Sequence, residues 1–229
     1  LEKLDGLKLT KQLTAFDKRV YIAVSGMFAQ SGQYMSAGQI FTAMGGRGKP
    51  SETQLQRIND SLTKMGAAHI YLDNSLETPV NKNYPSFRYD AALLPFERVS
   101  AYINNALVES AVHLFREPPL MTFARERKQI TTVTRMLLAI PLNQTEDNLI
   151  LEDYLIERIA SMKKPGSKQS RKMLFSTIYE KCKIDGKSAK DRTARSRSPE
   201  KIRKCLDHFT EQGYIKGYSV TKDGITIEP

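Results

Sequence analysis

The strongest constraint on the fold is an order of predicted elements that occurs twice along the chain: helices, then a capped helix, then two short strands. In the first half, a helix predicted over residues 51–66 opens with Ser51 and Gln54, which are spaced as in a capping box. Its apolar residues recur at helical spacing. Two strand-like stretches follow it, residues 68–73 and 87–94, with a polar loop between them. This order predicts a small helical domain with a hairpin beside its last helix.

The second half repeats this order after a helix predicted over residues 171–184. The capped helix is predicted over residues 198–213, with Ser198 as the N-cap and Pro199 at the first helical position. Two apolar runs on either side of an Asp-Gly pair at positions 223–224 then predict a hairpin. The recurrence therefore predicts a mostly helical α+β protein made of two tandem winged-helix domains.

The stretch between these halves is less regular. It predicts a helix over residues 98–115, a β-branched strand over 129–140 and a helix over 143–164. Pro, Gly and Ser then gather between Lys164 and Lys168, which we interpret as the domain junction. The predicted organisation is an N-terminal arm (1–15), a first winged-helix domain with an additional helix and strand (16–140), a connecting helix and linker (141–166) and a C-terminal winged-helix domain (167–229).

Positive charge is concentrated in one segment of the chain. The whole sequence has a formal net charge of +10, but residues 163–204 hold fifteen Lys and Arg residues against four Asp and Glu residues. The segment therefore carries +11, and the remainder of the chain carries −1. A strongly basic stretch is typical of a surface that binds a polyanion. We therefore expect nucleic-acid binding to reside in the C-terminal domain.

The predicted helix 198–213 places this charge beside an element that fits the DNA major groove. Ile202, Leu206 and Phe209 mark its apolar face, so Arg203 and Lys204 on the opposite face are expected to read bases. Cations in the flexible-looking stretch before the helix are expected to contact phosphates, as are backbone N–H groups around its start. The predicted DNA-binding residues are Lys187, Lys190, Arg192, Arg195, Arg197, Ser198, Lys201, Arg203, Lys204, Lys216 and Lys222. Accessory DNA-binding candidates, on the matching helix of the first half, are Thr53, Gln54, Arg57 and Lys64.

Other chemistries find little support in the sequence. Cys182 and Cys205 show no CxxC or zinc-ligand spacing, and His69, His113 and His208 are scattered without neighbouring ligands. No catalytic constellation stands out, so we expect no metal, no cofactor and no enzymatic activity. No apolar run approaches the roughly 20 residues of a membrane helix, and the first residues lack the apolar core of a signal peptide. These features predict a cytoplasmic protein.

Several segments along the chain resemble one protein family. They are KRVYIAVSGMF, QIFTAMGG, QLQRINDSLTKM, YDAALLPFE, LEDYLIERIASMK, KMLFSTIYEKC and KIRKCLDHFTEQGYIKGY. With these segments the chain resembles the winged-helix replication initiators of plasmids, the Rep family, in the branch common among Gram-positive bacteria and their mobile elements. The resemblance implies an N-terminal winged helix that forms a homodimer and can touch DNA, and a C-terminal one that binds repeats at the replication origin. It also implies recruitment of host replication proteins and repression of the protein's own promoter.

The function implied is sequence-specific binding to double-stranded DNA that initiates replication of a plasmid or mobile element. A solvated charged face would explain the basic run without DNA, although its coincidence with a capped helix and a hairpin favours nucleic acid. A tandem winged-helix transcription regulator would have the same electrostatics. A rolling-circle nickase would need a nucleophilic Tyr beside a His-rich metal site, which three scattered His residues do not favour.

Overall fold

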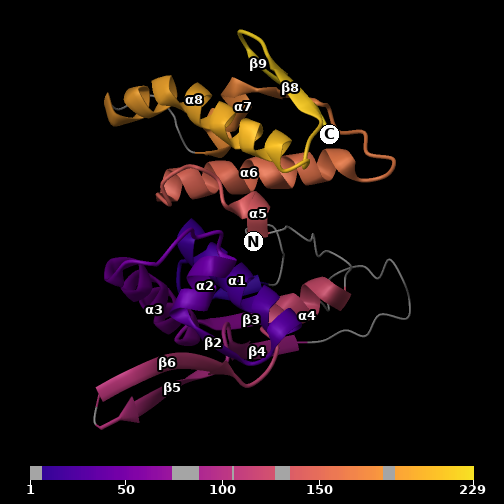
Figure 1. Ribbon diagram of the computed structural model, residues 1–229. Helices are drawn as coiled ribbons and strands as arrows, with labels where there is room; N and C mark the ends of the chain where they lie inside the picture. The colour runs from indigo at the N-terminus through magenta and orange to yellow at the C-terminus, as the bar shows by residue number, and fades with distance from the viewer. Residues whose placement is uncertain (1–6, 74–87, 105, 127–134, 183–188) are drawn as a thin grey trace. The chain divides into compact units, whose positions relative to one another are not determined.

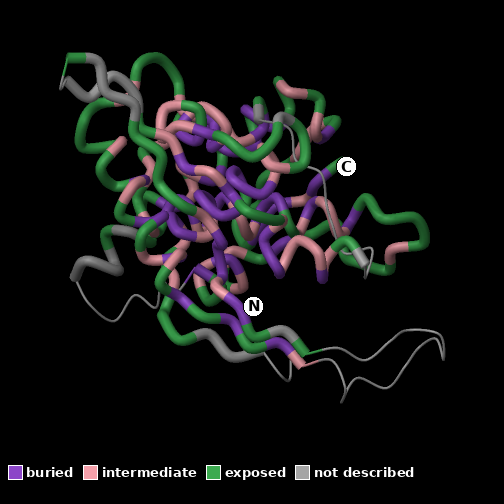
Figure 2. Tube along the Cα trace, turned by 90° about the horizontal axis from the view of Figure 1, so that it is seen from below, coloured by how far each residue is buried: buried purple, intermediate pink, exposed green. Residues whose placement is uncertain are grey.

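The computed structural model describes residues 7–73, 88–104, 106–126, 135–182 and 189–229, in two compact units, 1–130 and 131–229 (Figure 1). In these ranges, helices are combined with small antiparallel sheets of three strands each. The predicted mostly helical α+β class is confirmed. Figure 2 shows that exposed and buried positions alternate along much of the chain trace, as expected when each element turns one face to a core.

The first unit combines helices with two separate sheets. Its helices are α1 (Ala15–Ser31), α2 (Ala37–Ala43), α3 (Glu52–Gly66) and α4 (Pro119–Glu126), and its strands are β1 (Leu7–Leu9), β2 (Tyr34–Ser36), β3 (His69–Asp73), β4 (Arg88–Ala92), β5 (Phe96–Ile103) and β6 (Ala106–Leu114). One sheet has the strand order β1-β3-β4 and the other β2-β6-β5. A capping box opens α3, as the spacing of Ser51 and Gln54 predicts, and similar boxes open α1 and α2.

Residues 98–103 lie in β5 and residues 106–114 form β6, so the helix predicted over residues 98–115 is wrong. Burial alternates along the end of β6, where Val112 and Leu114 are buried and His113 between them is partly exposed. This period of two is that of a strand with one face on the core. Strands β3 and β4 form where strands were predicted and pair with each other, and β3 also pairs with β1. Part of the predicted N-terminal arm, residues 7–9, is strand β1.

The second unit repeats the element order of the first without an inserted strand pair. It contains α5 (Arg135–Leu138), α6 (Glu146–Lys163), β7 (Lys172–Leu174), α7 (Phe175–Lys181), α8 (Ala189–Glu211), β8 (Gly217–Val220) and β9 (Gly224–Glu228). Its sheet order, β7-β9-β8, matches β2-β6-β5 of the first unit. The hairpin predicted around positions 223–224 is confirmed as β8 and β9. We call residues 217–228 the C-terminal hairpin.

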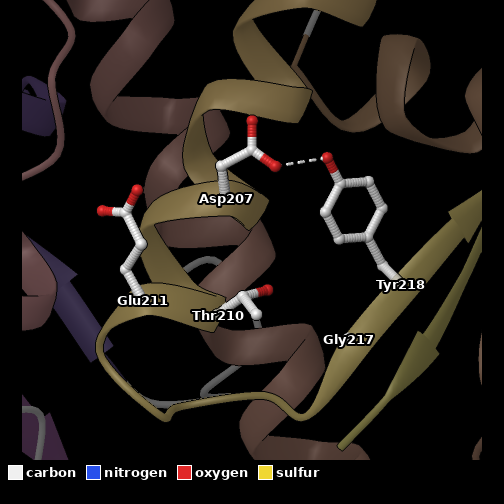
Figure 3. A pocket seen from close by; sticks show the side chains of 5 residues that line it. All are labelled: Asp207, Thr210, Glu211, Gly217 and Tyr218. Carbon is white, nitrogen blue, oxygen red and sulfur yellow. Dashed lines mark hydrogen bonds between the residues drawn. The ribbon is translucent and has the colours of Figure 1, made fainter.

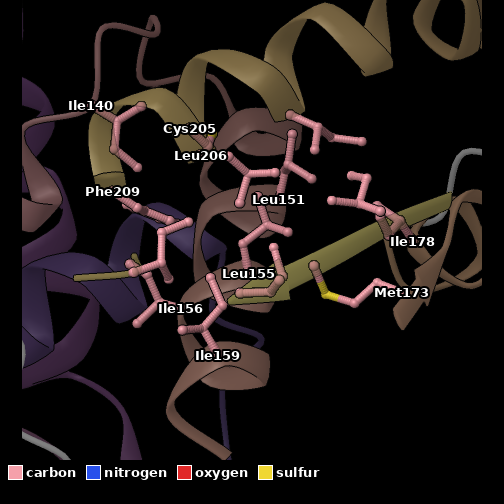
Figure 4. Close-up of a cluster of buried hydrophobic side chains, with 14 of the residues drawn as sticks. Ile140, Leu151, Leu155, Ile156, Ile159, Met173, Ile178, Cys205, Leu206 and Phe209 are labelled. Atoms are coloured by element: carbon pink, nitrogen blue, oxygen red, sulfur yellow. The ribbon is translucent and has the colours of Figure 1, made fainter. Parts of the chain in front are cut away.

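Helix α6 is part of the core of the second unit (Figure 4). Leu155 of α6 lies in the same buried cluster as Leu206 and Phe209 of α8. Because α6 supplies this core, the compact unit begins at Thr131, upstream of the junction predicted at Lys164–Lys168. The helix predicted over residues 143–164 is thus present, but it packs as a core helix and not as a linker.

Helix α8 begins at Ala189, well before the predicted start at Ser198. Pro199 therefore lies inside the helix, where its ring removes one N–H donor but keeps a helical φ. Ser198 is only 3% exposed. The predicted start is wrong because helix-compatible residues such as Ala194 continue the helix upstream of the proline.

The helix predicted over residues 171–184 divides into β7 and α7. Met173 of β7 pairs with Ile225 of β9 and is buried, so this apolar residue packs into the core from a strand and not from a helix. Residues 183–184 lie outside the described residues.

The strand predicted over residues 129–140 is wrong for residues 135–138, which form helix α5. Residues 129–134 lie outside the described residues. Leu137 is buried in the core of the second unit, so this short helix is held by packing.

Candidate nucleic-acid interface

Helix α8 divides into a buried face and an outward face, as its apolar spacing predicts. Ile202, Leu206 and Phe209 are fully buried, each with 0% exposure. Arg203 and Lys204 are exposed. Because the core holds one face of α8, the direction of the two outward cations is fixed by packing and not by a flexible loop.

The two outward cations differ in their partners. Lys204 Nζ lies 2.8 Å from Glu200 Oε1, and this hydrogen bond holds the pKa of the Glu200 carboxyl below its usual value. Both side chains are exposed, so the pair adds little stability and can open when a phosphate approaches. Arg203 forms no ion pair with any residue in the described ranges. Unlike Lys204, Arg203 therefore breaks no ion pair with a described residue when it binds an external group.

Lys201 points toward the protein itself. Its Nζ donates a hydrogen bond to Asn148 Oδ1 of α6 at 2.8 Å. Asn148 is only 5% exposed. Burial raises the pKa of the Cys205 thiol, the charge of Glu152 of α6 adds to this rise, and Lys201 opposes it. The ammonium group therefore belongs to a polar contact between α6 and α8. We leave Lys201 out of the proposed interface.

The described basic residues before the predicted helix start lie in the first turns of α8. Arg195 and Arg197 are exposed, and the guanidinium carbon of Arg195 lies 4.9 Å from the centre of the Tyr179 ring. Tyr179 in turn stacks on Phe175, so the cation–π contact rests on α7. The described part of this stretch is thus helical and supported, in contrast to the flexible segment expected. Lys190 and Arg192 also lie within α8, and Lys187 lies outside the described residues.

Ser198 does not form the anion site that was expected at the start of the helix. Because α8 begins at Ala189, the N–H groups around Ser198 belong to the interior of the helix, where such groups bond to preceding carbonyls. The side chain is also buried. The anion site was predicted at Ser198 because the Ser-Pro pair at positions 198–199 is typical of a helix start.

Two of the predicted cations lie in the C-terminal hairpin or next to it. Lys216 and Lys222 are exposed and flank strand β8. The hairpin lies close against β7, because a Cβ at Gly224 would lie 2.3 Å from the carbonyl oxygen of Met173. Glycine at this position therefore allows the turn to approach the strand.

A shallow hollow lies between the last turns of α8 and the start of β8 (Figure 3). Asp207, Thr210, Glu211, Gly217 and Tyr218 line it. The Tyr218 hydroxyl donates a hydrogen bond to Asp207 Oδ1 at 2.6 Å. Burial raises the pKa of Tyr218 to about 12, and the hydrogen bond to Asp207 adds to this effect. Sequence reasoning missed this pair, although Asp207 follows Arg203 by four residues and so lies on the same helix face.

The accessory candidates on α3 mostly serve the first unit itself. Gln54 Oε1 accepts the N–H of Ser51 at 2.8 Å, and the guanidinium of Arg57 lies 3.7 Å from the centre of the Phe16 ring. Lys64 Nζ lies 2.6 Å from Asp17 Oδ2. Thr53 is exposed.

Asp17 explains why Lys64 is held inward. Burial would raise the pKa of its carboxyl, but hydrogen bonds from Lys64, Thr14 and Ser61 lower it below its usual value. Strand β5 also contacts α3, because Arg98 donates to Asn59 Oδ1 at 3.0 Å. These contacts occupy side chains of α3 that a DNA-reading helix would direct outward.

None of the helices in the described ranges has the length and apolar character needed to cross a membrane. Within the same ranges, no group of three His, Cys, Asp or Glu residues is arranged to hold a metal ion.

Comparison with known proteins gives a match of fold alone. No family model and no curated protein matches the sequence. A crystal structure of selenomethionine derivatives of domains 2 and 3 of RctB aligns with a TM-score of 0.51 and 12% identity, over 86% of this chain and 71% of that one. A second crystal structure of RctB domains 2–3 aligns with a TM-score of 0.46 and 13% identity, over 97% and 86% of the two chains. This chain therefore has a fold similar to that of RctB domains 2 and 3.

Proposed function

We propose that this chain binds double-stranded DNA at specific sequences and initiates replication of a plasmid or mobile element by binding origin repeats. The observation that carries the proposal is the construction of the second unit. A core-anchored helix, α8, presents Arg203 outward, begins within the +11 segment and is followed directly by a hairpin. The family resemblance of the sequence adds to this support, and the similarity to RctB domains 2 and 3 extends over most of this chain as a likeness of fold.

In this proposal the second unit acts as a winged helix. Helix α8 enters the major groove, which is wide enough to admit an α-helix, and the C-terminal hairpin lies along the backbone. Arg203 donates to a guanine edge, since its planar guanidinium matches the two acceptors of guanine. Arg195, Arg197 and the hairpin cations contact phosphates, which strengthens binding to any duplex.

The first unit has a different role in the proposal. Residues 1–130 hold sixteen Lys and Arg against twelve Asp and Glu, a net charge of +4 that is spread along the chain without a run as basic as residues 163–204. Arg57 and Lys64 of α3 are engaged with Phe16 and Asp17. We assign it to homodimer formation and to contact with host replication proteins, on the basis of the family resemblance. Its DNA contacts are accessory.

A transcription regulator with two winged helices is the second candidate, because the same charged helix and hairpin would read an operator. The two functions differ in the DNA that they require. A replication initiator reads tandem repeats, each of about 20 base pairs if two winged helices bind successive grooves. A regulator reads one operator beside a promoter.

The test is selection of bound duplexes by the 229-residue chain from fragments of the DNA that surrounds its gene. Enrichment of tandem repeats that support plasmid replication in cells supplying the protein would support the initiator. Enrichment of a single operator, with replication unaffected by its deletion, would support the regulator. Recovery of fragments without any sequence preference would contradict both.

A further inference from the structure

The C-terminal hairpin is joined to α8 by a side-chain contact as well as by the chain itself. Backbone hydrogen bonds from Tyr214 and Ile215 to the Phe209 carbonyl, at 2.8 and 3.3 Å, fix the turn that leaves α8. Beyond this turn, the hydroxyl of Tyr218 reaches back to Asp207 (Figure 3). The hairpin is therefore attached to α8 at its base and again on its outward side.

This second contact lies on the side of α8 that carries Arg203. Asp207 follows Arg203 by one helical turn, and the positive charge of Arg203 is close enough to lower the pKa of Tyr218 against the larger effect of burial. Across the sheet, Tyr218 pairs with Ile227, which is fully buried. Tyr218 thus connects the outward face of α8 to a strand that the core holds in place.

We infer that the Tyr218–Asp207 hydrogen bond positions the C-terminal hairpin against α8, so that the hairpin and Arg203 meet one duplex in a fixed register. Both are positioning residues, and the inference rests on the proposed DNA binding. Without the bond, the hairpin keeps its pairing with β7 but gains freedom relative to the outward face of α8. Specific binding then weakens, because both elements must be aligned at once for base contacts.

The chemistry of the pair suits a lasting contact at neutral pH. With a pKa of about 12, Tyr218 keeps its proton and remains the donor. A hydrogen bond from a hydroxyl to a carboxylate is shorter and stronger than a hydrogen bond between two neutral groups, and the 2.6 Å separation of the oxygens agrees with this. Asp207 is exposed, so its negative charge also disfavours a phosphate at this end of α8. Backbone contacts are therefore directed to the basic first turns of the helix.

The test uses the whole chain and a duplex selected by it, beside a scrambled duplex of the same composition. Tyr218→Phe and Asp207→Ala each remove the bond, whereas Asp207→Asn keeps an amide oxygen that accepts from Tyr218. Glu211→Ala is the matched control, since it removes a carboxylate from the same hollow without touching the bond. Dissociation constants are measured at three salt concentrations, with thermal melting of each variant.

We expect Tyr218→Phe and Asp207→Ala to lower the ratio of specific to random affinity by about 3- to 10-fold, as loss of one hydrogen bond would. Asp207→Asn and Glu211→Ala should keep the ratio within about twofold. The salt slope should stay unchanged in Tyr218→Phe, because no phosphate contact is lost. An unchanged ratio of specific to random affinity in Tyr218→Phe would overturn the inference. An equal fall of this ratio in Glu211→Ala would also overturn it, because the effect would then come from charge in the hollow and not from the hydrogen bond. Absence of any preference in the unmodified chain would instead contradict the proposed function.

Discussion

Asn148 Oδ1 of α6 accepts a hydrogen bond from Lys201 Nζ of α8 at 2.8 Å. Lys201, which was predicted to bind DNA, therefore connects two helices of one core. Asn148 also donates to the Asn143 carbonyl at 2.8 Å, so the amide is held on both sides. The outward face of α8 is consequently defined by Arg203 and Lys204, without Lys201.

Lys201→Met should destabilise the protein by about 1–3 kcal/mol, because it leaves the buried Asn148 oxygen without its donor while keeping the length of the side chain. Lys204→Met is the matched control on the outward face and should change stability by less than about 0.5 kcal/mol. Urea unfolding measures both. A smaller loss of unfolding free energy for Lys201→Met than for Lys204→Met would show that the contact between Lys201 and Asn148 does not stabilise the fold.

The pair of Lys64 and Asp17 should make stability depend on pH. The folded-state pKa of Asp17 is lowered, so the carboxylate stabilises the fold above its unfolded pKa near 3.8, and this contribution is lost as pH falls through the lower folded value. Lys64→Met removes one of the hydrogen bonds that lower this pKa. We expect a loss of about 1–3 kcal/mol at pH 7 and a smaller further loss toward pH 3 than in the unmodified chain.

Urea midpoints measured from pH 7 to pH 3 test this expectation. The exposed pair of Lys204 and Glu200 supplies the control, since Lys204→Met should leave the pH profile nearly unchanged. Parallel pH profiles for Lys64→Met and the unmodified chain would contradict the assignment of Asp17.

Gly224→Ala should destabilise the second unit by about 1–3 kcal/mol, because the added Cβ would meet the Met173 carbonyl at 2.3 Å. Gly217→Ala is the control in the same hairpin, where the nearest atom to an added Cβ is a side-chain oxygen of Glu228 at 3.8 Å. Thermal melting compares the two. Equal melting temperatures for both variants would show that the hairpin does not approach β7 as closely as described.

Amphipathic helices were the part of the fold that the sequence predicted well. The apolar spacing of Ile202, Leu206 and Phe209 correctly gave the buried face of α8, and the capping box at Ser51 gave the start of α3. Both signals are local, since they depend on residues within one or two turns. The hairpin around positions 223–224 was found for the same reason.

Predictions failed where neighbouring elements decide the structure. Strands β5 and β6 contain Ala, Glu and Leu residues that also fit a helix. The pairing of β6 with β2 and with β5 is what selects the strand form. Lys201 and Asn148 are far apart in sequence, so no local pattern reveals their contact. Pro199 led to a wrong helix start at Ser198. Proline is common at the first position of a helix, but here it lies inside the continuous helix α8.

The central claim is that α8 reads bases with Arg203 while its first turns hold phosphates. Arg203→Ala and Arg197→Ala, made in the whole chain, separate the two roles because both residues are exposed on the same helix. Each variant is titrated against a selected duplex and a scrambled duplex over a range of salt concentrations.

Arg203→Ala should cost about 1–3 kcal/mol on the selected duplex and much less on the scrambled one. Arg197→Ala should weaken both alike and reduce the salt slope by about one unit. The direct measurement is therefore the dissociation constant of Arg203→Ala on the scrambled duplex divided by its dissociation constant on the selected duplex. We expect this ratio to be much smaller than in the unmodified chain. Equal losses of affinity on both duplexes would contradict base reading by α8.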